Sequence, residues 1–122
     1  MKKNNYFLNE CENMDFKGNL SFNELMKSAS KNYDSLTKMQ KRHLIEKLTR
    51  LAETSGQIWK VVKYADKMAY ALTKNQNKVI ISKLVECPDS DLKEVKNYAK
   101  KVGLVLFYLN KLTENEIAKV FT

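Results

Sequence analysis

The scarcity of turn-forming residues constrains the fold of this chain more than any other feature of its sequence. Only three glycines and one proline occur in 122 residues. All-β folds need many tight turns, and glycine and proline are prominent among the residues that form them. The sequence therefore predicts an all-α fold, a compact bundle of about six helices.

Helix-start signals recur along the chain and share one chemistry. A Ser or Thr is followed three residues later by Glu or Gln, so the hydroxyl can accept a bond from the third helical N–H while the acid or amide reaches back. This capping box occurs at Ser21, Thr37, Thr73 and Thr113. Asp91, three residues before a glutamate, gives a version with a carboxylate cap.

The helices expected from these starts fill the chain from residue 21 onward. Gly56 is expected to separate the second helix from the third, and Pro88 to end the fourth. Residues 1–20 are polar and asparagine-rich, which predicts a flexible N-terminal arm before a single helical domain at 21–122. The expected helices cover residues 21–32, 36–54, 57–72, 74–86, 91–110 and 114–121.

Two of these starts resemble each other over a longer stretch. Residues 36–40 read Leu-Thr-Lys-Met-Gln and residues 72–76 read Leu-Thr-Lys-Asn-Gln, and each is followed by an apolar pair and then by Lys-Leu. Such self-similarity is typical of duplicated helix pairs. It also arises when two unrelated helices begin with the same favourable cap, so both interpretations stay open.

The net charge of the chain is concentrated in its middle. Residues 35–85 hold eleven Lys and Arg against three acids, which equals the +8 of the whole chain, while residues 1–34 and 86–122 each balance. A general need for solubility would scatter the excess. A concentrated cationic segment predicts a patch for an extended anion, and nucleic acid is the commonest one in a cell.

The expected third helix carries the strongest basic pattern. At 100° per residue, Lys60, Lys63, Lys67, Tyr70 and Lys74 fall within an arc of about 80°. Lysines at these spacings repel each other, a bound polyanion relieves that repulsion, and Tyr70 can stack on a base. The face is equally typical of a solvated lysine-rich surface. A separate arc, expected to face the core, consists of Val62, Ala65, Met68, Ala69 and Leu72.

The first turns of the preceding helix add Lys38, Lys41 and Arg42. Arginine offers a planar fork for phosphate or a base edge, which lysine lacks. Cations near a helix N-terminus oppose the macrodipole, and this unfavourable placement favours a functional role. With Lys78 of the next helix, these residues complete the predicted nucleic-acid-binding set.

No catalytic or metal-binding constellation is evident. His43 is the single histidine, and Cys11 and Cys87 lie too far apart in sequence for a ligand motif. We expect a protein that is not an enzyme, binds no metal and no cofactor, and keeps its thiols reduced in the cytoplasm. Its first residues contain no apolar run long enough for a secretory signal or a membrane span, so no membrane partner is expected.

The apolar run from Gly103 to Leu109 ends the expected helix 91–110. Leu104, Phe107 and Tyr108 fall outside its core stripe, so this part of the helix would be apolar all round. We predict that these three residues form an interface with a partner. The alternatives are a central place in the core, or a short strand, since the run is rich in branched and aromatic residues.

Three stretches resemble one known family, the small helical subunit of type III-A CRISPR (Csm) effector complexes. Residues 36–42 are similar to that family's Leu-Thr-Thr-Ser-Gln-hydrophobic-Arg helix start, and residues 68–74 to its Ala-Tyr-x-x-Gly-Arg stretch. The third is the apolar, tyrosine-bearing end at residues 102–109. The chain departs from the family where Lys41 replaces a hydrophobe, Thr73 replaces glycine and Lys74 replaces arginine, and its tail from Leu112 has no counterpart.

The resemblance implies a subunit that is not an enzyme. Such subunits stack in several copies and form part of a basic channel that holds guide RNA paired to target RNA. Their contacts go mainly to the backbone, while base pairing supplies specificity. Carried over by position, Arg42 and Lys74 would be the family-type basic residues. The implied partners are RNA, other subunits of the complex and, through self-association, further copies.

Two other functions remain open on the sequence. The chain can be a stand-alone DNA-binding regulator or phage-type protein, with residues 73–109 bent into a helix-turn-helix. Against this, the second helix of that segment turns apolar, where a recognition helix presents polar side chains to the groove. The chain can also be a protein-binding module or inhibitor that works through residues 104–108, with its lysines only solvating the surface.

Overall fold

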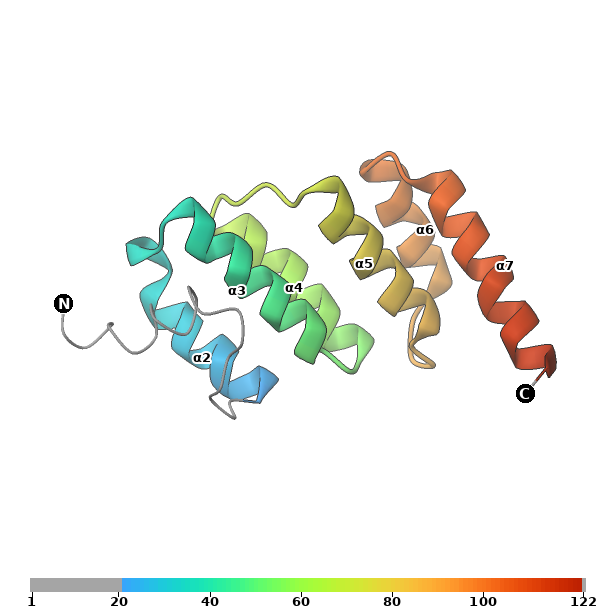
Figure 1. Cartoon of the computed structure of the whole chain (residues 1–122), viewed down its shortest axis with the longest axis horizontal. Coiled ribbons are helices and arrows are strands. Elements are labelled where there is room, and N and C mark those ends of the chain that lie inside the picture. Colours follow the sequence, from blue (N-terminus) through green and yellow to red (C-terminus); the bar gives the residue numbers. More distant parts are fainter. Residues whose placement is uncertain (1–20, 122) are drawn as a thin grey trace. The chain divides into compact units, whose positions relative to one another are not determined.

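The computed structural model describes residues 21–121, which contain six α-helices, one short 3₁₀ helix and no strand. The predicted all-α fold is therefore confirmed, and the short strand considered for residues 103–109 does not form. The predicted arm at 1–20 lies outside the described residues. Figure 1 labels the α-helices α2 (Phe22–Asn32), α3 (Lys38–Leu51), α4 (Ser55–Lys67), α5 (Lys74–Glu86), α6 (Leu92–Lys101) and α7 (Val105–Phe121). The 3₁₀ helix η2 (Tyr33–Ser35) lies between α2 and α3.

The chain divides into two compact units. The first unit consists of residues 1–52 and 59–71, and the second of residues 53–58 and 72–122. The first thus holds α2, η2, α3 and most of α4. The second holds the first turn of α4 together with α5, α6 and α7, and each unit buries an apolar interior of its own.

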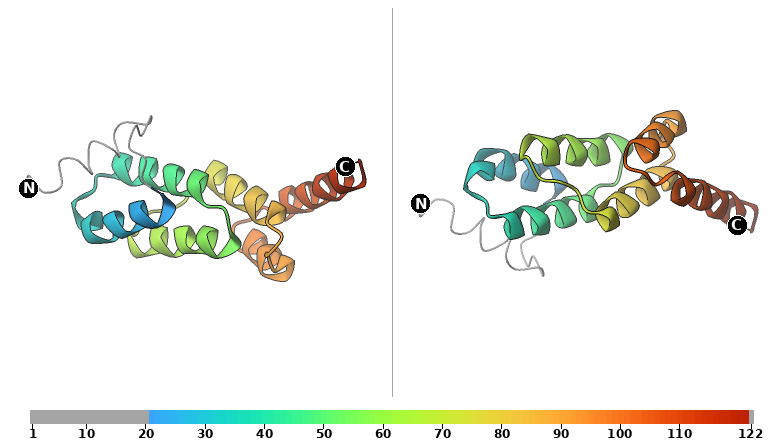
Figure 2. Two further views of the ribbon diagram at one scale, coloured as in Figure 1. Left: turned by 90° about the horizontal axis from the view of Figure 1, so that it is seen from below. Right: turned by 90° about the horizontal axis from the view of Figure 1, so that it is seen from above.

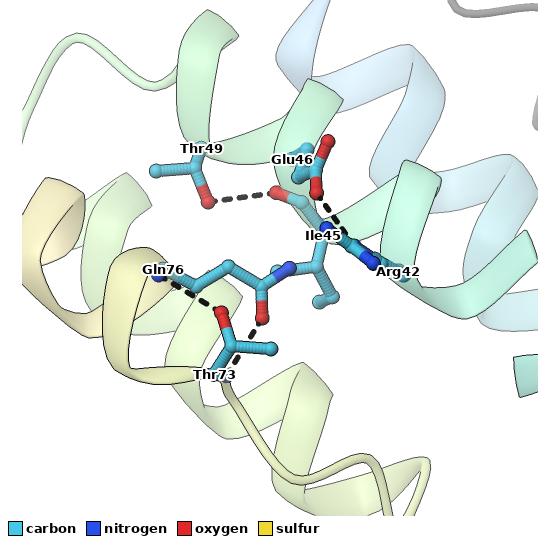
Figure 3. Close-up of polar contacts among 6 residues, drawn as sticks. All are labelled: Arg42, Ile45, Glu46, Thr49, Thr73 and Gln76. Carbon is cyan, nitrogen blue, oxygen red and sulfur yellow. Dashed lines mark hydrogen bonds and ion pairs between the residues drawn. The ribbon is translucent and has the colours of Figure 1, made fainter. Parts of the chain in front are cut away.

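In the first unit, α2 lies beside both α3 and α4 (Figure 2). The Tyr64 hydroxyl on α4 donates a hydrogen bond to the carbonyl of Ala29 on α2. The interior includes Leu44 and Val61, which are fully buried. Thr49 is also buried and satisfies its hydroxyl by donating to the Ile45 carbonyl at 2.7 Å (Figure 3), which makes a polar side chain acceptable there.

In the second unit, α5 contacts both α6 and α7. The Tyr98 hydroxyl on α6 donates to Oδ1 of Asn77 on α5, and burial raises the pKa of Tyr98 to about 12. The Asn115 side-chain amide on α7 donates to the Val85 carbonyl on α5 at 3.4 Å. The side chains of Ile80, Ile81, Leu84 and Val95 are fully buried.

Three of the predicted capping boxes are present. Ser21 and Glu24 exchange bonds at the start of α2. Thr37 accepts from the Gln40 N–H at 3.1 Å and donates its own N–H to the Gln40 side chain at 2.8 Å. Thr73 and Gln76 repeat this arrangement at the start of α5 (Figure 3). Because the partners of each box lie only three residues apart, the sequence displays both of them.

The prediction was wrong at the end of the chain, where the helices 91–110 and 114–121 do not exist as such. Gly103 has φ 74° and interrupts the first of them, so α6 ends at Lys101 and α7 runs on from Val105. Thr113 therefore caps nothing. It lies inside α7 and donates its hydroxyl to the Leu109 carbonyl at 3.0 Å.

The predicted helix 57–72 was also wrong at both ends. Gly56 lies inside α4 rather than before it, and the helix stops at Lys67 because Ala69 takes φ 56°. The N–H of Ala69 donates to the Asp66 carbonyl and that of Tyr70 to the Ala65 carbonyl. These two bonds form a Schellman motif, which satisfies carbonyls at a helix end.

The same motif ends α6. The N–H of Gly103 donates to the Lys100 carbonyl at 3.3 Å, and that of Leu104 to the Ala99 carbonyl at 2.8 Å. Residues 64–70 read Tyr-Ala-Asp-Lys-Met-Ala-Tyr, and residues 98–104 read Tyr-Ala-Lys-Lys-Val-Gly-Leu. The self-similarity thus extends to the ends of two helix pairs, α3 with α4 and α5 with α6. Because this motif ends a large share of all helices, duplication and independent use of favourable ends both stay open.

Candidate nucleic-acid interface

The two units differ in charge. Among the described residues, the first unit carries ten Lys and Arg against four acids, a difference of +6, and the second carries nine against seven, a difference of +2. The basic excess that the sequence places at residues 35–85 thus belongs mainly to the first unit. A polyanion should be drawn to that unit before the other.

Three lysines of α4 share one exposed face. Lys60, Lys63 and Lys67 are all exposed and fall within an arc of about 60°. We call these three residues the α4 lysine face. They span about 10 Å along the helix axis, which matches the axial rise of about three nucleotides of one duplex strand at about 3.4 Å each.

Two lysines of this face have no acidic partner among the described residues. Within residues 21–121, neither Lys60 nor Lys63 forms an ion pair. Asp66 is exposed as well, three residues after Lys63, and lies about 60° outside the arc of the lysines. Because Lys60 and Lys63 form no ion pair, their repulsion at this spacing is left for a bound anion to relieve.

Tyr70 and Lys74 do not extend this face. The arc expected from the sequence assumed a helix through residue 72, whereas α4 ends at Lys67. Tyr70 is only 8% exposed, so its ring is not available to stack on a base. Lys74 is exposed but begins α5, in the second unit.

The predicted inner arc of α4 is only partly in the core. Ala65 and Met68 are buried as expected. Val62 and Leu72 are half-buried, and Ala69 is exposed because the left-handed backbone at this position turns it out of the helical arc.

The Lys41 side chain bonds to the backbone at the C-terminal end of α4. Its Nζ donates to the Met68 carbonyl at 2.9 Å, and a cation there also interacts favourably with the C-terminal end of the helix dipole. The bond places the start of α3 next to the last residue of the α4 lysine face, Lys67. Lys38, exposed in the first turn of α3, lies at this end of the first unit too.

Arg42 follows Lys41 and pairs within its own helix. Its Nε lies 3.1 Å from Oε1 of Glu46, and the Arg42 side chain remains 56% exposed (Figure 3). An exposed pair of this kind contributes little to stability and exchanges readily for another anion. A phosphate that contacts Arg42 therefore competes with Glu46 for the guanidinium.

A second basic constellation lies in the second unit. The Phe107 ring has Lys78 Nζ at 5.5 Å and Lys111 Nζ at 5.6 Å from its centroid. Such distances fit cation–π contacts. Beside them is an open pocket of about 490 Å³, lined by Lys74, Lys78, Gly103, Leu104, Val105, Leu106, Phe107 and Asn110. Sequence reasoning included Lys78 but not its contact with Phe107, because the two are 29 positions apart.

The predicted interface residues separate into two groups. Leu104 and Tyr108 are buried. The Tyr108 hydroxyl donates to the Leu92 carbonyl at 3.2 Å, and burial raises its pKa. Only Phe107 stays partly exposed. The break at Gly103 changes the direction of the chain, so the angular positions expected for one continuous helix do not apply to these residues.

Residues 21–121 contain no group of three or more His, Cys, Asp and Glu side chains that could hold a metal ion. In the same range, no helix combines the length and the apolar character needed to cross a membrane. Cys87 is a half-buried thiol that contacts the Glu53 carbonyl, and burial raises its pKa. Cys11 lies outside the described residues.

No protein-family model, curated protein or solved structure matches this chain.

Proposed function

We propose that this protein binds the backbone of RNA without catalysis, through the basic surface of its first unit. The observation that carries the proposal is the α4 lysine face, which is exposed, lacks ion pairs at Lys60 and Lys63, and belongs to the unit with a charge difference of +6. Lysines arranged in this way neutralise phosphates and release counterions, which gives affinity without sequence preference.

The resemblance to the Csm small subunit supports RNA as the ligand and a larger assembly as the setting. We propose that the chain is a small subunit of a type III CRISPR ribonucleoprotein that contacts the guide–target backbone. Of its family-type residues, Arg42 lies on α3 beside the end of α4, and Lys74 begins α5. Both are exposed, as a backbone contact requires.

The binding proposal is tested by measuring affinity for single-stranded RNA, duplex RNA and duplex DNA across a salt series. Non-specific binding by a small basic patch is expected at about 10⁻⁴–10⁻⁶ M. Replacing Lys60, Lys63 and Lys67 together by Ala should weaken binding to all sequences equally. It should also flatten the salt slope by about one unit for each phosphate that these lysines neutralise in the wild type.

A matched control removes the same charge elsewhere. Lys93, Lys96 and Lys100 are exposed on α6, in the second unit, and their replacement by Ala should change the slope much less. Equal reductions in affinity in the two triple variants would mean attraction by net charge alone and would contradict a site on α4. A preference for duplex DNA would favour the regulator alternative, and failure to bind any nucleic acid the protein-binding alternative.

The assembly proposal is tested separately. Affinity-tagged protein isolated from its natural host should carry guide-length RNA and other effector subunits, and CRISPR effector genes should adjoin its own. Binding of RNA in solution without either association would retain the RNA-binding function and reject the CRISPR assignment.

A further inference from the structure

The outer face of α7 is apolar and exposed. Four large apolar residues there are Leu106, Leu109, Ile117 and Val120, with exposed fractions of 78%, 43%, 52% and 79%. Together with Thr113 they fall within an arc of about 80° on the helix. Thr113 belongs to this apolar stripe because its hydroxyl is bonded to the Leu109 carbonyl, which leaves its methyl group as the free part of the side chain.

The opposite face of α7 is already packed. Tyr108 is buried and bonded to the Leu92 carbonyl, and the Asn115 amide is bonded to the Val85 carbonyl. These bonds fix α7 against α5 and α6. No helix among residues 72–121 covers the apolar stripe, since its members keep the exposures given above. A contiguous apolar stripe on a surface helix is typical of an interaction site.

The intervals between successive residues of the stripe are the same whether α7 is followed from its N-terminus or from its C-terminus. Its members follow each other at intervals of 3, 4, 4 and 3 residues, with Thr113 at the centre. In an antiparallel pair of two such helices related by a two-fold axis at Thr113, Leu106 lies opposite Val120 of the second copy and Leu109 opposite its Ile117. Their angular offsets from the stripe centre are opposite in sign, so the side chains interdigitate instead of colliding.

We propose that a second copy of this chain covers the stripe, through an antiparallel α7–α7 contact with two-fold symmetry. A symmetric interface requires a surface complementary to itself, and the reversible spacing supplies it. The arc contains no charged side chain, so a strongly charged partner finds nothing to match on it.

The size of the contact predicts its strength. A helix of 17 residues is about 25 Å long. One pair of such helices buries less than the roughly 800 Å² per partner of a standard interface. The dimer should therefore dissociate with a constant weaker than about 1 μM and be visible only as a concentration-dependent equilibrium.

Sedimentation of the full chain over a wide concentration range tests this dimer. The wild type should shift from monomer to dimer as concentration rises. Ile117→Glu and Leu106→Glu should each weaken the dimer at least tenfold, because each places a carboxylate in an apolar layer. Helicity measured by circular dichroism should not change, since both positions are exposed.

Val79→Glu is the matched control. Val79 is 48% exposed on α5, in the same unit, and lies outside the stripe. This variant should dimerise like the wild type. A wild type that stays monomeric at all concentrations would overturn the proposal, and so would an equally weakened dimer in the Val79 variant. A dimer that appears only after deletion of residues 1–20 would also overturn it, because the chain's own N-terminus would then be the occupant.

Cross-linking tests the symmetry. In a background with Cys11→Ser and Cys87→Ser, Thr113→Cys should form a disulfide-linked dimer on oxidation, because residue 113 meets its own copy at the two-fold axis. A mixture of the Leu106→Cys and Val120→Cys variants should cross-link more than either variant alone. Efficient cross-linking of Leu106→Cys to itself would indicate parallel helices and contradict the antiparallel arrangement.

Discussion

The helix pair α3–α4 and the helix pair α5–α6 agree in the features that define their ends. Each begins with a Thr–Gln capping box, at Thr37 and at Thr73. Each ends with a Schellman motif, at Ala69 and at Gly103. These features fix where the helices start and stop, so the two pairs share the determinants of their local structure.

The pairs differ on the exposed face of their second helix. At a distance of 34 residues, Lys60 corresponds to Glu94 and Lys63 to Asn97, while the fully buried Val61 corresponds to the equally buried Val95. The interior position is the same and these two surface positions differ, whereas Lys67 has an exposed lysine, Lys101, as its counterpart. The exposed lysines of α6, Lys93, Lys96 and Lys100, stand at other positions, so the α4 lysine face does not follow from the features that the two helix pairs share.

The largest expected effects test whether the two interiors are equivalent. Leu48 and Leu84 both follow the repeated lysine on the first helix of their pair, and both are fully buried. Replacing either by Ala should lower the free energy of unfolding by about 2–5 kcal/mol, because apolar burial decreases and a cavity remains. Denaturant unfolding measures this. A cost below about 1 kcal/mol at one site only would show that the two interiors are built differently.

Substitutions at the left-handed residues of the two Schellman motifs should change stability in opposite directions. Gly103→Ala should cost about 1–2 kcal/mol, because a left-handed residue with a Cβ is strained. An added Cβ there meets nothing within 4 Å, so the cost is one of backbone conformation alone. Ala69→Gly should stabilise the first unit by up to about 1 kcal/mol for the same reason. Thermal unfolding of both variants checks this, and a destabilised Ala69→Gly would contradict the strain assigned to Ala69.

The helix starts were more predictable than the helix ends. The caps at Thr37 and Thr73 are local exchanges between side chain and backbone, and the sequence displays both partners. The end of α4 depends on a left-handed alanine, which no propensity favours. The break at Gly103 was visible as a glycine, but the apolar run after it argued for a continuous helix.

The candidate site, like the helices, was predictable only where it depends on local geometry. The exposed arc of Lys60, Lys63 and Lys67 follows from helical geometry and holds as far as the helix does. Tyr70 and Lys74 were misplaced because the helix ends before them. The Lys78–Phe107 contact joins distant parts of the sequence, so only the tertiary packing of the second unit produces it.

The two capping boxes should contribute about equally. Thr37→Ala and Thr73→Ala each remove a hydroxyl that accepts the N–H of a glutamine three residues on, at 3.1 Å in both helices. Each should cost about 1 kcal/mol of unfolding free energy. Denaturant unfolding of the two variants side by side gives the comparison. A cost at Thr37 much above that at Thr73 would mean that α3 relies on its cap more heavily than α5 does.

The smallest expected effect concerns Arg42 on α3 and the residue 36 positions later on α5, Lys78. Arg42 pairs with Glu46, whereas its counterpart Lys78 lies over the Phe107 ring, and Ser82 stands where Glu46 would be. Glu46→Gln should change the free energy of unfolding by less than about 0.5 kcal/mol, since the pair is exposed and places its cation N-terminal to its acid. The same change releases Arg42 for phosphate.

RNA affinity should therefore rise in Glu46→Gln at low salt, and the gain should fade as salt screens the added charge. Glu94→Gln supplies the control, because it makes the same charge change on the exposed face of α6. RNA titrations of both variants at two salt concentrations distinguish the release of Arg42 from the general effect of removing one negative charge. A gain in Glu46→Gln no larger than that in Glu94→Gln would remove Arg42 from the binding surface and leave the α4 lysine face to act alone.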